Sequence, residues 1–276
     1  NLMNRQPHPL RGDFEWLRPA TKPRRLSKEQ VDLYDREGFF VLEDAFTAAD
    51  LQPVIAELDQ FEADTTKMLK EHSEDGTWFI NRADEITFSA QLVQRSKLLA
   101  DFCRGPVFQD LVHDLIGPNV RLYWDQAVYK KPGNPQSFPW HQDNGYTFIE
   151  PQQYLTCWIA LSDATEENGC PMVVPGVHRE GTLEHEYTDL GFNCFQSAPE
   201  EVVVAPVRAG GIVVFSSLTP HSTGPNISDD IRKSYIVQFC PDGCVSVALD
   251  ESGTRVEAPI ENPETQFQVL VNGKPA

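Results

Sequence analysis

The chain has 276 residues, of which 40% are hydrophobic and 23% are charged, as in a globular protein that folds without disulfides or a structural metal. Acidic residues outnumber basic ones by 41 to 23, and the formal net charge of −18 argues against nucleic acid and anionic membranes as partners. We therefore expect a small-molecule substrate, while the oligomeric state stays open.

Three further features favour a cytoplasmic protein. The first residues contain no apolar stretch of the kind that a secretory signal needs. No apolar run reaches the roughly eighteen residues that a membrane span requires. The six cysteines form no C-x-x-C pair, so we interpret them as reduced, buried thiols.

The first part of the chain predicts a helical layer preceded by an arm. Residues 1–26 are rich in proline and arginine without periodicity, which predicts an extended arm. A capping box at Ser27 and Gln30 predicts a short helix that ends near Gly38. We expect residues 27–118 to be mostly helical. The elements expected after the first helix are a strand at 39–42, a helix opened by Thr47 and Asp50, and helices within 92–116.

The second part of the chain predicts a β core. From about residue 120, short segments rich in β-branched and aromatic residues alternate with turn clusters, which favours a sandwich or barrel. No G-x-G-x-x-G motif opens a helix and no P-loop occurs, which argues against nucleotide binding. We expect a single domain whose core spans residues 119–276. The expected strands are 120–130, 154–162, 171–174, 201–207, 211–216 and 234–239.

A His-x-Asp motif in this β region predicts a metal site. In an extended strand, the side chains of His141 and Asp143 project from the same face, because their positions differ by two. An imidazole and a carboxylate supply two ligands to a divalent metal, and a second histidine would complete a facial triad with open coordination positions.

The third ligand should come from a later part of the β region. His221 follows the strand expected at 211–216, whereas His178 is the alternative. Arg232 stands at the start of the next expected strand, and a planar guanidinium is suited to clamp a carboxylate. If the segments that carry His221 and Arg232 are neighbouring antiparallel strands, both side chains can lie at one barrel mouth, where Thr223 could add a hydroxyl.

These residues resemble the phytanoyl-CoA dioxygenase family of iron(II)/2-oxoglutarate oxygenases. The resemblance implies a double-stranded β-helix, the cupin-like jelly-roll core, flanked by N-terminal helices. It also implies Fe(II) as the metal, with 2-oxoglutarate and O2 as cosubstrates. The segments that carry it lie within 120–243 and are Gln126–Lys131, Trp140–Asp143, Cys157–Gly169, Val174–His178, His221–Thr223 and Arg232.

The same resemblance implies roles for individual residues. The implied iron ligands are His141, Asp143 and His221, and the implied cosubstrate-binding residues are Arg232, Thr223, Trp158 and Gln126. One branch of the family replaces the metal carboxylate by a small residue, which opens a halide site. Because Asp143 is present here, hydroxylation is favoured over halogenation.

The expected function is hydroxylation of a small organic molecule, such as a secondary metabolite, with release of succinate and CO2. Residues 178–200 are long enough to form a lid over the site. Candidate substrate-binding residues are Tyr146, Phe148, Tyr187, Phe192, Phe195 and Arg82. The alternatives are desaturation, epoxidation or rearrangement by the same chemistry, a non-catalytic cupin-like metal-binding protein, and a zinc hydrolase.

Overall fold

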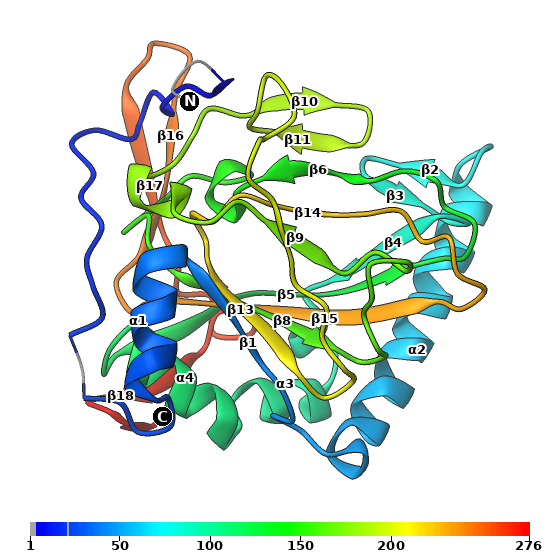
Figure 1. Ribbon diagram of the computed structural model, residues 1–276, viewed down its shortest axis with the longest axis horizontal. Helices are drawn as coiled ribbons and strands as arrows, with labels where there is room; N and C mark the ends of the chain where they lie inside the picture. Colours follow the sequence, from blue (N-terminus) through cyan, green and yellow to red (C-terminus); the bar gives the residue numbers. More distant parts are fainter. Residues whose placement is uncertain (1–3, 21) are drawn as a thin grey trace.

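Two antiparallel sheets face each other, and helices cover the outer side of the larger sheet (Figure 1). The computed structural model describes residues 4–20 and 22–276. The larger sheet runs in the order β1 (Phe39–Leu42), β13 (Ile212–Ser216), β8 (Leu155–Ala160), β15 (Arg232–Pro241), β5 (Val120–Lys130), β4 (Ile86–Ala90), β3 (Asn81–Arg82) and β2 (Thr77–Trp78). Next to β5 lies β18 (Gln268–Val271), which pairs with β19 (Lys274–Pro275).

The opposing sheet has four short strands. Its order is β12 (Val203–Val204), β9 (Pro171–Val173), β14 (His221–Thr223) and β6 (Phe138–His141). Two smaller sheets flank it, one of β10 (Glu186–Thr188) and β11 (Gly191–Asn193), the other of β17 (Arg255–Pro259), β16 (Val245–Leu249) and β7 (Ile149–Glu150). The helices are α1 (Lys28–Glu37), α2 (Ala48–His72), α3 (Lys97–Cys103) and α4 (Pro106–Leu115), with 3-10 turns η2 (Leu92–Gln94), η3 (Asp143–Gly145) and η4 (Val177–Glu180).

Local signals in the sequence are confirmed at the starts of the helices and along the central strand. The Ser27 side chain accepts a hydrogen bond from the Gln30 N–H, and the Gln30 side chain accepts one from the Ser27 N–H. Helix α1 begins directly after Ser27, at Lys28. Gly38 ends α1 at a positive φ of 84°, and any side chain there would overlap the His178 ring. The strand predicted at 120–130 has the same bounds as β5.

Two expectations differ from the structure. The layer expected to be mostly helical also contains β2, β3 and β4, because β4 finds a long antiparallel partner in β5, from Ile86 opposite Lys130 to Ala90 opposite Gln126. The strand expected at 201–207 shrinks to the two residues of β12. Pro206 has no N–H to continue the ladder, which explains the short strand.

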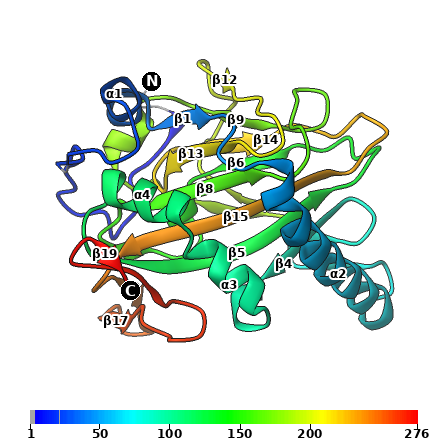
Figure 2. The same ribbon diagram turned by 90° about the horizontal axis from the view of Figure 1, so that it is seen from below.

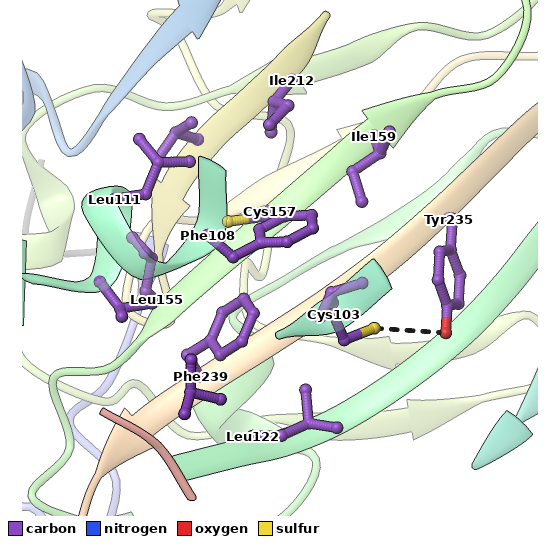
Figure 3. Close-up of a cluster of buried hydrophobic side chains, with 14 of the residues drawn as sticks. Cys103, Phe108, Leu111, Leu122, Leu155, Cys157, Ile159, Ile212, Tyr235 and Phe239 are labelled. Atoms are coloured by element: carbon purple, nitrogen blue, oxygen red, sulfur yellow. Dashed lines mark hydrogen bonds between the residues drawn. The ribbon is translucent and has the colours of Figure 1, made fainter. Parts of the chain in front are cut away.

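The main hydrophobic core lies between the larger sheet and the helices, as seen from below in Figure 2. Alternate residues of β8 and β15 point toward Phe108 and Leu111 of α4 (Figure 3). The opposite residues of these strands point into the space between the sheets. The larger sheet therefore separates a packed outer core from an inner face that is free to line a site.

A buried carboxylate fixes the extended arm to the helical layer. Asp114 of α4 accepts backbone N–H groups from Arg24, Arg25 and Leu26 at 2.7, 2.9 and 3.0 Å, and His113 Nδ1 lies 2.8 Å away. Three charge-assisted bonds at one fully buried side chain make this the strongest local tie of the arm.

We expect Asp114→Ala to lower the free energy of unfolding by about 3 kcal/mol, because it leaves buried N–H donors without acceptors. Urea denaturation measures the change. Asp110→Ala on the same helix is the control, since its exposed pair with Arg25 should contribute only about 0.5 kcal/mol. Equal losses in the two variants would contradict this account of the arm.

Candidate active site

The register between β6 and β14 sets His141 directly opposite His221. The two imidazole ring centroids are 4.1 Å apart, and both side chains are buried. Asp143 joins them, so that one donor atom from each of the three residues lies within 4.8 Å of the others. Within the described residues, this is the only such group of histidine, cysteine or acidic side chains.

Asp143 reaches the group although β6 ends at His141. Gln142 keeps an extended backbone, with φ −104° and ψ 144°, so the residues on either side of it project in the same direction. Asp143 Oδ1 lies 3.6 Å from His141 Nε2 and 3.4 Å from His221 Nε2. Its other oxygen, Oδ2, accepts the Thr156 hydroxyl at 2.5 Å, which fixes the carboxylate plane.

Both histidines turn the same ring nitrogen toward Asp143. His141 Nδ1 lies 2.8 Å from the Pro139 carbonyl, and His221 Nδ1 lies 2.9 Å from the Thr219 carbonyl. A carbonyl only accepts, so each Nδ1 carries the proton and each Nε2 presents a lone pair. This backbone support of metal-binding histidines orients the rings as well as selecting the tautomer.

Electrostatics favour the protonation states that a divalent metal needs. Burial raises the pKa of Asp143, but the His221 and His141 imidazoles outweigh it and hold that pKa well below its usual range. Burial, and next the neighbouring His221, lower the pKa of His141. An ionised carboxylate and a neutral imidazole at neutral pH follow from this arrangement.

Gln142, which the sequence did not single out, anchors the ligand segment. Its buried amide donates to the carbonyls of Gly181 at 3.0 Å and Leu218 at 2.7 Å, and accepts the Leu183 N–H at 2.6 Å. The Gln142 N–H donates to His185 Nε2 at 2.9 Å. These bonds tie the metal-ligand segment to the residues that precede β10 and β14.

The three residues open onto a cavity of about 500 Å³ between the two sheets. Each residue expected to bind the cosubstrate lies in its wall: Arg232, Thr223, Trp158 and Gln126. The segments of His221 and Arg232 are not neighbouring strands, so the condition considered for bringing them together does not apply. β14 pairs with β6 and β9, whereas β15 pairs with β5 and β8, and the two segments meet because their sheets face each other.

Arg232 is a fully buried cation. Its guanidinium lies 5.0 Å from the centre of the Trp158 ring, and Nη1 donates to the Gly169 carbonyl at 2.5 Å. Nε has no hydrogen-bond partner, and among the described residues no carboxylate lies close enough to pair with it. Burial lowers the pKa of Arg232 to about 10. A buried guanidinium with an unmet donor beside a cavity is arranged to receive an anion.

A second buried basic side chain, that of Lys130, lies opposite Arg232 in the β5–β15 pairing. Its Nζ donates to Thr223 Oγ1 at 2.8 Å and to the Gly224 carbonyl at 2.6 Å. Burial, and next the charge of Arg232, lower the pKa of Lys130 to about 6. The sequence argument missed this residue, although it shares the inward-facing alternation of Gln126 and Val128 on the same strand.

The structure brings only some of the candidate substrate residues to the cavity. Tyr146 and Phe192 line it. Phe148 instead stacks on His8, with ring centroids 4.7 Å apart, and Phe195 packs in a separate cluster with Trp140. The two are held by the arm and by the stretch before β12, on the far side of the ligand segment.

Two further candidate substrate residues, and the alternative third metal ligand, lie outside the cavity wall. Tyr187 stacks on Phe79 at the mouth, and Arg82 donates to the Asp189 carbonyl at 2.9 Å. His178, the alternative third ligand, is not part of the metal-binding group, since its Nε2 lies 2.9 Å from the Asp35 carbonyl.

Comparison with known proteins identifies the family. Residues 34–234 match the family described as Phytanoyl-CoA dioxygenase (PhyH). The chain belongs to the phytanoyl-CoA dioxygenase family. The predicted enzyme class, a non-haem iron dioxygenase dependent on 2-oxoglutarate, is thereby confirmed, as is the predicted family.

Similar proteins cover most of the chain. The "Phytanoyl-CoA dioxygenase" of Arabidopsis thaliana is 23% identical over 79% of this chain and 90% of its own length. The "Ectoine dioxygenase" of Bordetella parapertussis is 26% identical over 74% and 71%. The crystal structure of the "non-heme alpha ketoglutarate dependent carbocyclase SnoK from nogalamycin biosynthesis" superposes with a TM-score of 0.65 at 25% identity, covering 82% of this chain and 89% of SnoK. The predicted jelly-roll core flanked by helices is confirmed.

In residues 4–20 and 22–276, no helix combines the length and the apolar character that crossing a bilayer demands.

The pKa of Lys130 predicts a pH dependence of stability. Between about pH 6 and its ordinary pKa of 10.5, the unfolded chain holds a proton on Lys130 that the native state lacks. The destabilisation by Lys130, relative to Lys130→Met, should therefore shrink as pH rises, by up to about 1.4 kcal/mol per pH unit. Urea denaturation at about pH 6.5, 7.5 and 8.5 measures the difference in the free energy of unfolding.

Lys131→Met is the matched control, because this adjacent residue follows the end of β5 and its ammonium pairs with Glu62 of α2 at 2.7 Å. The difference in free energy of unfolding between Lys131→Met and the parent should not change with pH over the same range. A flat difference for Lys130→Met as well would show that Lys130 keeps its proton in the native state.

Proposed function

We propose that this protein hydroxylates a small organic molecule, with iron(II) held by His141, Asp143 and His221 and with 2-oxoglutarate anchored at Arg232. The observation that carries the proposal is the buried Arg232 guanidinium, which has an unmet donor and faces the same cavity as the three candidate ligands. A metal-binding group alone fits many functions, whereas this combination is suited to a metal-chelating diacid.

The donor set fits ferrous iron. Two neutral imidazole nitrogens and one carboxylate oxygen form a facial triad that leaves coordination positions for a chelating cosubstrate and oxygen. The backbone carbonyls behind both histidines and the Thr156 hydroxyl behind Asp143 hold these donors in place. When bound, the iron supplies oxygen activation coupled to oxidative decarboxylation of 2-oxoglutarate to succinate and CO2.

The residues around Arg232 fit the distal carboxylate of 2-oxoglutarate. Its Nε supplies an unmet donor, and Thr223 presents a hydroxyl that already accepts a hydrogen bond from Lys130. The Trp158 ring supports the guanidinium plane from one side. The carboxylate would neutralise a cation that burial otherwise leaves without a partner.

The alternatives explain fewer of these features. A zinc hydrolase would use the three ligands but gives no role to Arg232, and a non-catalytic metal-binding protein gives none to the 500 Å³ cavity. Desaturation, epoxidation and rearrangement share this site, and product analysis separates them from hydroxylation. The presence of Asp143 supports hydroxylation over halogenation.

We also propose one oxygenase domain over residues 1–276 and a cytoplasmic location. The six unpaired, buried cysteines support the location.

Anaerobic addition of iron(II) and 2-oxoglutarate tests the proposal through the visible metal-to-ligand charge-transfer band of the complex. Arg232→Met should raise the Kd for 2-oxoglutarate at least about 100-fold, because a buried charge-assisted clamp is lost. Iron binding should persist. Arg121→Met is the control, since Arg121 pairs with Asp242 at the other end of β5. If Arg232→Met binds 2-oxoglutarate as the parent does, the assignment of this pocket is wrong.

Thr156→Val tests how the carboxylate ligand is positioned. Loss of the hydroxyl that holds Asp143 Oδ2 should weaken iron(II) binding about tenfold, in the range found for residues that support metal ligands. Chelator competition under anaerobic conditions measures the affinity. Thr87→Val removes another buried hydroxyl, one that donates to Glu62 away from the cavity, and should leave iron affinity unchanged. Equal iron(II) affinities in the two variants would show that Thr156 does not position the Asp143 carboxylate.

A further inference from the structure

The part of the cavity that Arg232 does not occupy is uncharged. Asp143 and Arg232 are the only acidic or basic residues other than histidine in its wall, among the residues that the structure describes. Both are already engaged by the proposed metal and cosubstrate. The remaining wall is dominated by the aromatic side chains of Phe79, Phe88, Trp124, Phe138, Tyr146 and Phe192.

Several of the neutral polar groups in this wall have partners within the protein. Trp124 Nε1 donates to Gln126 Oε1 at 3.1 Å, and Gln238 Nε2 lies 3.4 Å from Thr156 Oγ1. A charged substrate group would therefore lose its hydration without gaining an ionic partner, which is strongly unfavourable. Aromatic faces remain as the main surface offered to a substrate.

A strained hairpin tip lies at the mouth of this cavity. Trp78 pairs with Asn81, which leaves Phe79 and Ile80 as the two turn residues between β2 and β3. Phe79 has a positive φ of 54°, a conformation that costs a bulky residue free energy and that such turns normally give to glycine or asparagine. An apolar residue kept there at 51% exposure indicates a role for its ring.

A second hairpin meets this tip from the other side. The Tyr187 ring, on β10, stacks on Phe79 with centroids 6.0 Å apart and planes 10° from parallel. Arg82, the one basic residue of the two hairpins, is engaged by the Asp189 carbonyl. In Figure 1 the β10–β11 hairpin lies above β6, and the β2–β3 hairpin lies at the right, beside β4.

Aromatic rings continue from this contact to the metal-binding group. Tyr187 lies 5.5 Å from Phe192, Phe192 lies 4.7 Å from Tyr146, and Tyr146 lies 5.3 Å from His141, measured between ring centroids. Each contact is edge to face, so in every pair the edge of one ring points at the face of its neighbour. The row forms one apolar wall from the surface to the proposed iron.

From these features we infer that the two hairpins form the substrate-recognition gate, and that the substrate is an uncharged molecule with an apolar ring system. The inference rests on the proposed function, since it assigns Asp143 and Arg232 to metal and cosubstrate. The substrate passes between Phe79 and Tyr187 and lies against Phe192 and Tyr146. Substrates that carry phosphates, including coenzyme A thioesters, are disfavoured because the hairpins offer no free cation.

The test compares two probes of similar shape, neutral 2-naphthol and anionic 2-naphthoate, by equilibrium dialysis against the protein loaded anaerobically with iron(II) and 2-oxoglutarate. The parent should bind 2-naphthol at least about tenfold more tightly, because the naphthoate charge is desolvated without a partner. Phe79→Asn should weaken 2-naphthol binding about fivefold through loss of the ring contact. Equal affinities for the two probes, or tighter binding of naphthoate, would overturn the inference.

Trp78→Ala is the matched control, because Trp78 is 67% exposed on the same hairpin but does not line the cavity. It should bind 2-naphthol as the parent does. Phe79→Asn should keep or raise the melting temperature, since asparagine tolerates a positive φ, so weaker binding cannot be assigned to unfolding. Parent-like binding by Phe79→Asn would refute the gate.

The charge-transfer band of the same samples distinguishes a failure of this inference from a failure of the proposed function. A band in the parent together with no preference for 2-naphthol leaves the proposed function intact and refutes only the inference about the substrate. Absence of the band from the parent refutes the proposed function and, with it, the substrate assignment.

Discussion

The pairing of His141 with His221 across β6 and β14 determines the geometry of the site. Both strands are short, and a shift of one residue in their register would turn a ligand away from the cavity. The register is secured from both sides, since β14 also pairs with β9 and the buried Gln142 amide fixes the chain just after β6. Asp143 needs only one extended residue beyond this pairing to complete the group.

Two buried basic side chains on the facing sheet show how folding acts on charge at one end of the cavity. Arg232 and Lys130 occupy directly opposite positions on β15 and β5, and burial together with the charge of Arg232 lowers the pKa of Lys130. Lys130 donates to the Thr223 hydroxyl and the Gly224 carbonyl, which arranges a polar cluster at the end of the cavity. Arg232 is left as a buried charge with an unmet donor, which the carboxylate of the proposed cosubstrate would neutralise.

The sequence predicted the features that depend on local physics. The capping box at Ser27 and the alternation along β5 need only neighbouring residues, and so does the common direction of His141 and Asp143. Features that depend on distant partners were missed or wrong. β4 exists because β5 lies beside it, and whether His221 and Arg232 share a sheet is decided by the whole topology. Lys130 shares the inward-facing alternation of β5, but its burial was not predicted, because a lone lysine at a strand end is usually solvated.

The proposed metal chemistry and the inferred substrate selection involve different parts of the fold. The proposed ligands lie on paired strands inside the molecule, whereas the aromatic contact at the mouth joins two hairpins whose tips are half exposed. A hairpin tip can change sequence without disturbing a sheet register, because few buried contacts depend on it. In this chain the strained Phe79 is retained at such a tip, where stability alone would favour glycine or asparagine.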